Sequence, residues 1–133
     1  KKSLMNKFQK NPILGHITTF GGHPVIAAAG FKSLSIILKE RLSEKTLDKE
    51  RLFRSLLKHP YIQEIRGKGL MIALILKNEK LANQLVLKSL DNGLILFWLL
   101  YEKKAVRITP PLNISETEIK KGCKIILSIL NSI

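Results

Sequence analysis

The strongest restriction on the fold comes from a run of seven apolar residues, Leu70 to Leu76 (LMIALIL), near the middle of the chain. Its length and its flanking turn residues predict a buried strand. The preceding segment, Tyr61 to Arg66, alternates in part between apolar and polar residues and predicts a second strand. Gly67-Lys68-Gly69 separates the two strands and predicts a turn or bulge. The chain is therefore expected to build part of its core on a sheet.

Four other segments have the apolar spacing of helices and carry recognisable start signals. The first is expected to run from Pro24 to about Leu42, and the second to stop before His59-Pro60. The third is expected to close at Asn92-Gly93. The predicted starts are Pro24 as first helical residue, Thr46 and Asn78 as N-caps, and Ser115 with Glu118 as a capping box.

Two further strand patterns, residues 94–100 and 105–109, flank the turn segment Glu102 to Lys104 and suggest a hairpin. Residues 1–22 are expected to be irregular, with turn signals at Asn11-Pro12 and at Gly21-Gly22. Helices interrupted by a few strands favour an α/β (α+β) layered fold.

The composition is that of a folded domain with an excess of positive charge. Of 133 residues, 45% are apolar, which excludes a disordered tail. The net charge is +13, but the lysines are scattered along the chain, which is typical of a solvated surface. Nucleic-acid binding is therefore not expected, although a basic α+β nucleic-acid-binding module stays open as the alternative.

The remaining bulk features bear on localisation. The longest apolar run, Gly93 to Leu100, is too short to span a bilayer, and Lys1-Lys2 is not followed by a signal-peptide pattern. Cys123 is the only cysteine and cannot form an internal disulfide, which favours a reducing compartment. We expect a cytoplasmic protein with no membrane association.

The segment from Gly15 to Pro24, GHITTFGGHP, could bind a phosphate group. Thr18 and Thr19 supply hydroxyls, the Gly pair lets backbone approach a ligand, and a predicted helix begins directly after it. The segment matches neither the P-loop nor the dinucleotide-binding pattern. A glycine turn with a threonine cap is the alternative interpretation.

Arg107 is the candidate for binding a carboxylate. It stands between Val106 and Ile108, so strand alternation places it on the opposite face from those two residues. A guanidinium can hold a carboxylate with two parallel hydrogen bonds. An exposed arginine on a strand is the alternative. A metal site is not expected, because His16 and His59 lack other ligands at metal-binding spacing.

Three segments together resemble a known family. GHITTFGGHP, then EIRGKGLMIAL, then VRITPPLNISETEI are similar, in this order and spacing, to the C-terminal part of the class III aminotransferases. This family includes acetylornithine, ornithine and 4-aminobutyrate aminotransferases. The resemblance covers nearly the whole chain from about Met5.

The resemblance implies a C-terminal portion of a fold-type I enzyme that depends on pyridoxal 5'-phosphate. Residues 1–22 would end the large cofactor-binding domain, and residues 23–133 would form the small domain, a mostly antiparallel sheet covered by helices. Such enzymes are homodimers that move an amino group from an amino acid or ω-amino acid to a 2-oxo acid. By this resemblance Thr19, with Thr18 beside it, would contact the cofactor phosphate of the partner subunit. Arg107 would bind the substrate α-carboxylate.

The resemblance also places the Schiff-base lysine, and the aspartate that pairs with the pyridine nitrogen, upstream of this chain. No residue of the chain is therefore assigned as catalytic, and the chain alone is expected to be inactive. Two positions depart from the family pattern. His23 replaces a common asparagine, and the apolar stretch before Arg107, LFWLLYEKK, replaces polar and small residues.

Overall fold

The computed structural model describes residues 1–9, 15 and 17–133. The chain divides into two compact units, Lys1–Glu40 and Arg41–Ile133. The predicted boundary between residues 22 and 23 rests on the family resemblance and stays a prediction.

The first unit contains two short helical segments and one long helix. Helix α1 spans Lys2–Met5, the 3₁₀ helix η1 spans Asn6–Phe8, and helix α2 spans Pro24–Lys39. The prediction that the whole of residues 1–22 is irregular is therefore wrong for residues 2–8. The predicted turn at Asn11-Pro12 lies outside the described residues.

Helix α2 begins at the predicted residue, Pro24, whose missing N–H would have no partner inside the helix. Its large apolar side chains lie in water rather than in a core. Val25, Phe31 and Leu38 are 70%, 75% and 67% exposed, and none of the residues of α2 is buried. The helix therefore has apolar surface that the first unit leaves uncovered.

The second unit is an α+β layer built on a four-stranded sheet. Its elements are α3 (Leu42–Leu56), β1 (Ile62–Lys68), β2 (Met71–Leu76), α4 (Glu79–Asp91), β3 (Phe97–Trp98), β4 (Ala105–Ile108) and α5 (Glu116–Asn131). The strand order is β1-β2-β4-β3, and every neighbouring pair is antiparallel. The predicted small antiparallel sheet covered by helices is confirmed.

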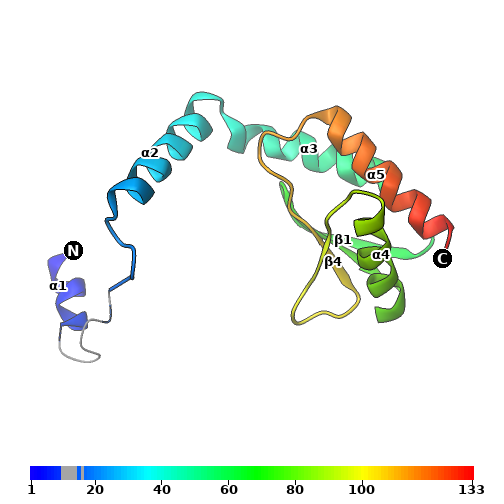
Figure 1. Ribbon diagram of the computed structural model, residues 1–133, viewed down its shortest axis with the longest axis horizontal. Helices are drawn as coiled ribbons and strands as arrows, with labels where there is room; N and C mark the ends of the chain where they lie inside the picture. Colours follow the sequence, from blue (N-terminus) through cyan, green and yellow to red (C-terminus); the bar gives the residue numbers. More distant parts are fainter. Residues whose placement is uncertain (10–14, 16) are drawn as a thin grey trace. The chain divides into compact units, whose positions relative to one another are not determined.

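Helices α3, α4 and α5 cover one face of this sheet, and α3 lies alongside α5 (Figure 1). Strand alternation sends every second side chain of β2 and β4 into this layer, which forms the main core. The strand residues at its centre are Ile72, Leu74, Leu76, Val106 and Ile108.

The opposite side of the sheet is called the far face and is defined by Arg66, Met71, Ala73, Ile75, Ala105 and Arg107. Only a small apolar cluster lies there: Ala73, Ile75 and Ala105 are buried, and Leu99 packs against them. Met71 is 76% exposed.

Three element boundaries differ from the prediction. Helix α2 ends at Lys39, with Glu40 as its C-cap, and not near Leu42, which is the first residue of α3. Helix α3 begins at Leu42 and not after Thr46, because Arg41 takes a left-handed conformation (φ 51°) and pairs with Glu44 one turn later. The Thr46 hydroxyl donates instead to the Ser43 carbonyl inside the helix. Strand β3 covers only Phe97 and Trp98, a small part of the predicted strand over residues 94–100.

The other start and stop signals are confirmed. The Asn78 side chain accepts a hydrogen bond from Leu81 N (2.9 Å), and Gly93 has a left-handed φ of 72° just after the end of α4. Ser115 and Glu118 form the reciprocal capping box at the start of α5.

Candidate functional site

Arg107 lies on β4 with its side chain on the far face, as strand alternation predicts. Its neighbours Val106 and Ile108 are 0% and 6% exposed and point into the main core. Arg107 pairs across the sheet with Ala73 on β2 and with Phe97 on β3. The guanidinium carbon stands 5.2 Å from the centre of the Phe97 ring. The side chain therefore rests on an aromatic face at the edge of the sheet.

A pocket of about 160 Å³ on the far face brings a second arginine near Arg107. Arg66 lies in the same cross-strand row, since both arginines are neighbours of Ala73 on β2. The Nε of Arg66 donates to Glu64 (2.7 Å). The lining residues are Arg66, Gly67, Met71, Ile72, Ala73, Leu99 and Arg107. Two cationic groups on an apolar floor are well suited to an anionic ligand.

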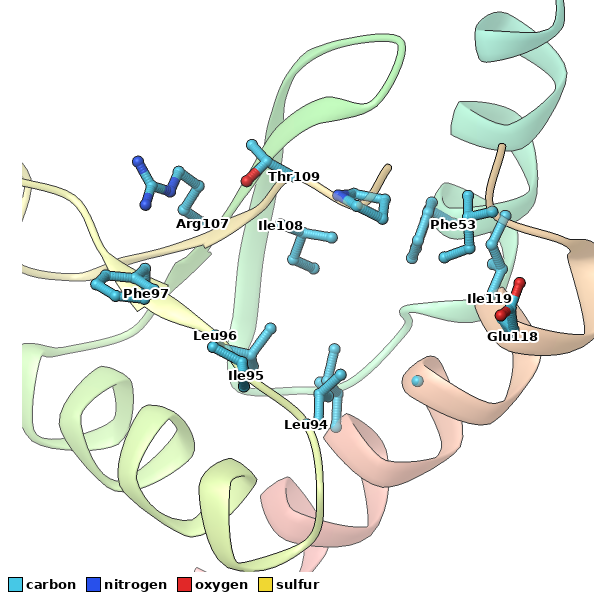
Figure 2. Close-up of a pocket in the computed structure, with 14 residues that line it drawn as sticks. Phe53, Leu94, Ile95, Leu96, Phe97, Arg107, Ile108, Thr109, Glu118 and Ile119 are labelled. Atoms are coloured by element: carbon cyan, nitrogen blue, oxygen red, sulfur yellow. The ribbon is translucent and has the colours of Figure 1, made fainter. Parts of the chain in front are cut away.

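A separate pocket of about 150 Å³ lies behind β4, between the sheet and α5. Its walls are mostly apolar, with Phe53, Ile108 and Ile119 among them. Figure 2 shows that the Arg107 guanidinium extends away from these residues. This second pocket is mostly apolar, and Arg107 and Phe97 are also among the residues that line it.

The segment before α2 folds into two successive tight turns. Gly21 N donates to Thr18 O (3.2 Å), and His23 N donates to Phe20 O (3.1 Å). The Thr18 hydroxyl lies over Gly21, where any Cβ would clash with it, and Gly22 has a φ of 79°. Gly22 therefore suits the left-handed backbone at this turn, and a Cβ at position 21 would require the Thr18 side chain to move.

Thr18 and Thr19 are both exposed, and the long helix α2 begins five residues after Thr19. His23, at the N-cap of α2, makes no side-chain cap hydrogen bond, and its ring meets Phe20 edge-on at 6.3 Å. Thr19 belongs to the first unit and Arg107 to the second.

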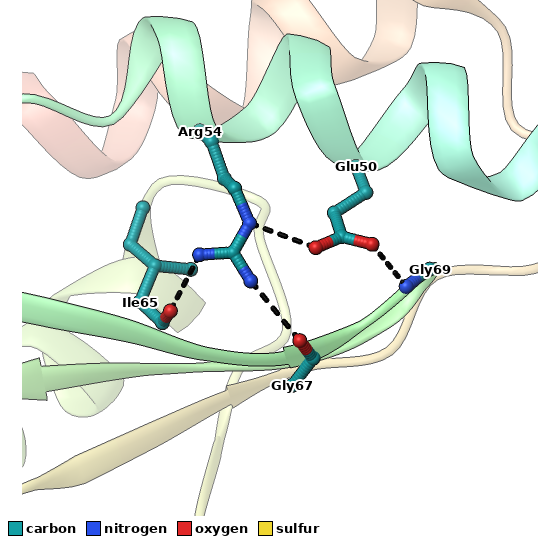
Figure 3. A network of polar contacts seen from close by, with 5 residues as sticks. All are labelled: Glu50, Arg54, Ile65, Gly67 and Gly69. Carbon is teal, nitrogen blue, oxygen red and sulfur yellow. Dashed lines mark hydrogen bonds and ion pairs between the residues drawn. The ribbon is translucent and has the colours of Figure 1, made fainter.

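Sequence reasoning missed a polar network that joins α3 to the β1–β2 hairpin (Figure 3). Arg54 on α3 donates to Glu50 Oε1 (2.8 Å), to Ile65 O (2.5 Å) and to Gly67 O (3.0 Å). The other oxygen of Glu50 accepts from Gly69 N (2.5 Å). The available signal was the i,i+4 spacing of Glu50 and Arg54, which is also common on solvated helices.

Glu50 in this network and Cys123 in the core have pKa values shifted by their surroundings. The Gly69 N–H, and then the Arg54 guanidinium, lower the pKa of Glu50 from its ordinary value of 4.5. Burial raises the pKa of Cys123 to about 11, so its thiol stays neutral inside the core. Trp98 donates to Asn83 (2.7 Å) on α4, so it serves the layer packing rather than a ligand.

Among the described residues, no group of three or more His, Cys, Asp or Glu side chains is arranged to hold a metal ion. His59 bonds Asn131 (3.1 Å), and His16 lies outside the described residues. Within the same part of the chain, the helices lack the combination of length and apolar character that crossing a bilayer requires.

Comparison with known proteins gives one consistent result. A family model described as aminotransferase class-III matches residues 1–130. Acetylornithine aminotransferase from Caldanaerobacter subterraneus subsp. tengcongensis is 36% identical over 123 residues, which cover 89% of this chain. The chain spans 30% of the length of that relative.

Solved structures agree with the sequence comparison. Acetylornithine aminotransferase from Elizabethkingia anophelis has a TM-score of 0.78 and 31% identity, over 89% of this chain and 32% of its own. Ornithine aminotransferase from Toxoplasma gondii has a TM-score of 0.74 and 27% identity, over 87% of this chain and 29% of its own. The latter structure has partial occupancy of pyridoxal phosphate at its active site.

Proposed function

The chain belongs to the class III aminotransferases, and we propose that it supplies the C-terminal portion of an enzyme that moves an amino group from an amino acid or ω-amino acid to a 2-oxo acid. The relatives match this chain over about a third of their own length, so the activity is assigned to the complete enzyme. The observation that supports the proposal most strongly is the position of Arg107, exposed beside a pocket and at the place that the family resemblance gives to carboxylate binding.

Arg107 is proposed to bind the α-carboxylate of the amino-acid substrate. Its planar fork of N–H donors can hold both carboxylate oxygens and so fix the direction of the rest of the substrate. Fixing the substrate in this way places the bond that must break in the productive orientation, which is a large part of the catalytic advantage in such enzymes.

Thr19 is proposed to bind the phosphate of the cofactor, pyridoxal 5'-phosphate, across a homodimer interface. Both threonines are exposed, and the turn geometry favours Thr19 over Thr18 because the Thr18 hydroxyl is directed at Gly21. The adjacent N-terminus of α2 adds partial positive charge, which suits a phosphate. These residues therefore fit the phosphate end of the cofactor.

When bound, pyridoxal phosphate supplies the electron sink for amino-group transfer. The residues of this chain supply binding and orientation, and the Schiff-base lysine is proposed to lie upstream. The exposed apolar residues of α2 support a homodimer, since surface of this kind is normally covered by further protein. A cytoplasmic location is proposed, consistent with one buried, reduced cysteine.

Substitution of Arg107 in the complete enzyme tests the proposal. Loss of charge-assisted hydrogen bonds predicts that Arg107→Ala raises KM for the amino donor by roughly ten- to a hundredfold with little change in cofactor affinity. Thr19→Ala is expected to lose cofactor on dialysis, while Thr19→Ser, which keeps the hydroxyl, retains it. An unchanged KM would remove Arg107 from the site, and equal cofactor retention in Thr19→Ala would remove Thr19.

The chain of 133 residues provides a control, since it is expected to show no transaminase activity and no new absorbance band with added cofactor. The alternative, a basic nucleic-acid-binding module, is not favoured by the comparisons, which lead to aminotransferases. A salt-dependent gel shift with short DNA or RNA would revive it.

A further inference from the structure

We propose that Phe97 is a positioning residue, which holds the Arg107 guanidinium in the orientation that receives a carboxylate. Phe97 belongs to the apolar stretch LFWLLYEKK, where the family resemblance leads us to expect polar and small residues. The expected effect of Phe97 on substrate binding rests on the proposed function. The expected restraint of the Arg107 side chain by Phe97 does not.

The two side chains are direct cross-strand neighbours. Phe97 on β3 and Arg107 on β4 face each other in the antiparallel register, so both lie on the far face. The guanidinium carbon is 5.2 Å from the ring centre, which is within the range of a cation–π interaction. Phe97 is 52% exposed, so the hydrophobic core does not account for its position.

The opposite neighbour of Arg107 cannot provide this support. On that side the cross-strand partner is Ala73, which has no side chain beyond Cβ. Arg66, one strand further along the same row, is oriented by its own hydrogen bond to Glu64. Phe97 is therefore the neighbour in this row that offers a flat surface to the guanidinium.

The charge of Arg107 is left for an external anion. Within the residues that the structure describes, no carboxylate forms an ion pair with Arg107, in contrast to Arg41, Arg51, Arg54 and Arg66. The guanidinium carbon lies over the Phe97 ring, and a contact with an aromatic ring does not use up the N–H donors that a carboxylate needs. An arginine side chain that is free to move loses conformational entropy when it binds a ligand. Because the Phe97 ring restricts the Arg107 side chain before binding, the entropic cost of binding is smaller.

Two kinds of replacement separate this role from apolar packing. Phe97→Leu keeps apolar volume on the edge strand but has no aromatic face, whereas Phe97→Tyr keeps the face. Tyr101→Ala is a matched control, because it removes an aromatic residue of the same hairpin that is 96% exposed. If Phe97 acts only through apolar packing, Phe97→Leu should keep the wild-type KM for the amino donor.

The first measurement is NMR of the 133-residue chain. The side-chain protons of Arg107 are expected to show an upfield ring-current shift that is lost in Phe97→Ala and Phe97→Leu and kept in Phe97→Tyr and Tyr101→Ala. Absence of the shift in the wild type, or its loss in Tyr101→Ala, would overturn the inference. This result does not depend on aminotransferase activity.

The second measurement is steady-state kinetics of the complete enzyme. From the size of exposed cation–π interactions, Phe97→Ala and Phe97→Leu are expected to raise KM for the amino donor roughly two- to fivefold with kcat preserved. Phe97→Tyr should restore the wild-type KM. A fall in kcat at unchanged KM in the Phe97 variants would contradict the positioning role. This outcome is distinct from failure of the proposed function, which is tested by Arg107→Ala.

Discussion

Replacing Arg54 by alanine should destabilise the second unit far more than replacing the neighbouring Arg51. Arg54 donates three hydrogen bonds, two of them to carbonyl groups of the β1–β2 hairpin. Its side chain is 37% exposed and its partner Glu50 14% exposed. Removing Arg54 therefore leaves a largely buried carboxylate with one remaining partner, the Gly69 N–H.

The magnitude follows from these contacts. A hydrogen bond to a charged group contributes ~1.5–3 kcal/mol, and the partial exposure of Arg54 reduces this to ~1 kcal/mol for each of its bonds. The expected loss of unfolding free energy is thus roughly 2–3 kcal/mol for Arg54→Ala. Arg51 pairs with Asp48 on the same helix, but both side chains are 72% exposed, so Arg51→Ala should change stability by less than ~0.5 kcal/mol.

Urea denaturation of the 133-residue chain at pH 7, followed by circular dichroism at a helical wavelength, measures both variants. Amide hydrogen exchange at Gly69 provides a local measurement, since Arg54→Ala should loosen the hairpin and speed exchange there. Equal, small losses in Arg54→Ala and Arg51→Ala would refute the idea that the network fastens the hairpin to α3.

The same network predicts a pH dependence with a definite sign. The pKa of Glu50 is lower in the folded chain than its ordinary value of 4.5. Its contribution to stability is therefore complete above about pH 4.5 and is lost as the pH falls through the lowered folded-state pKa. Glu50→Gln should flatten this part of the stability profile; an unchanged acid limb would contradict the assignment.

Three other predictions concern single residues. Gly67→Ala should cost at least ~2 kcal/mol, because φ is 111° and the new Cβ would lie 2.9 Å from Ile72 Cα. Gly122→Ala, inside α5 with its nearest neighbour at 3.9 Å, should instead stabilise by ~0.5–1 kcal/mol; urea titrations showing the same sign for both would refute this. Cys123, 2% exposed and with its pKa raised to about 11, should react with a thiol reagent at pH 8 only after unfolding, and fast labelling of the native chain would contradict its burial.

Most elements of the second unit could be predicted from the sequence, because their boundaries are set by side chains that contact backbone groups only a few residues away. The capping box at Ser115, the N-cap at Asn78 and the apolar run ending at Leu76 each specify a boundary through nearby backbone groups. The start of α3 was missed because a left-handed arginine at position 41, paired with Glu44, is a rare way to begin a helix.

The extent of β3 depends on distant parts of the chain. Residues 94–100 are apolar throughout, so they carry no alternation that could define an edge strand. Only Phe97 and Trp98 meet β4, and Leu100 is left 85% exposed. The position of Arg107 was predictable from alternation, whereas its stacking on Phe97 required the register of the two strands.

The central proposal is that Arg107 binds the substrate carboxylate and that Thr19 binds the cofactor phosphate in the complete enzyme. A crystal structure of the complete enzyme with pyridoxal phosphate and a carboxylate-bearing substrate analogue tests it most directly. We expect the Thr19 hydroxyl on the phosphate of one active site, and the Arg107 guanidinium, stacked on Phe97, on the analogue's carboxylate. A structure with the carboxylate bound elsewhere, and with Thr19 remote from every phosphate, would contradict it.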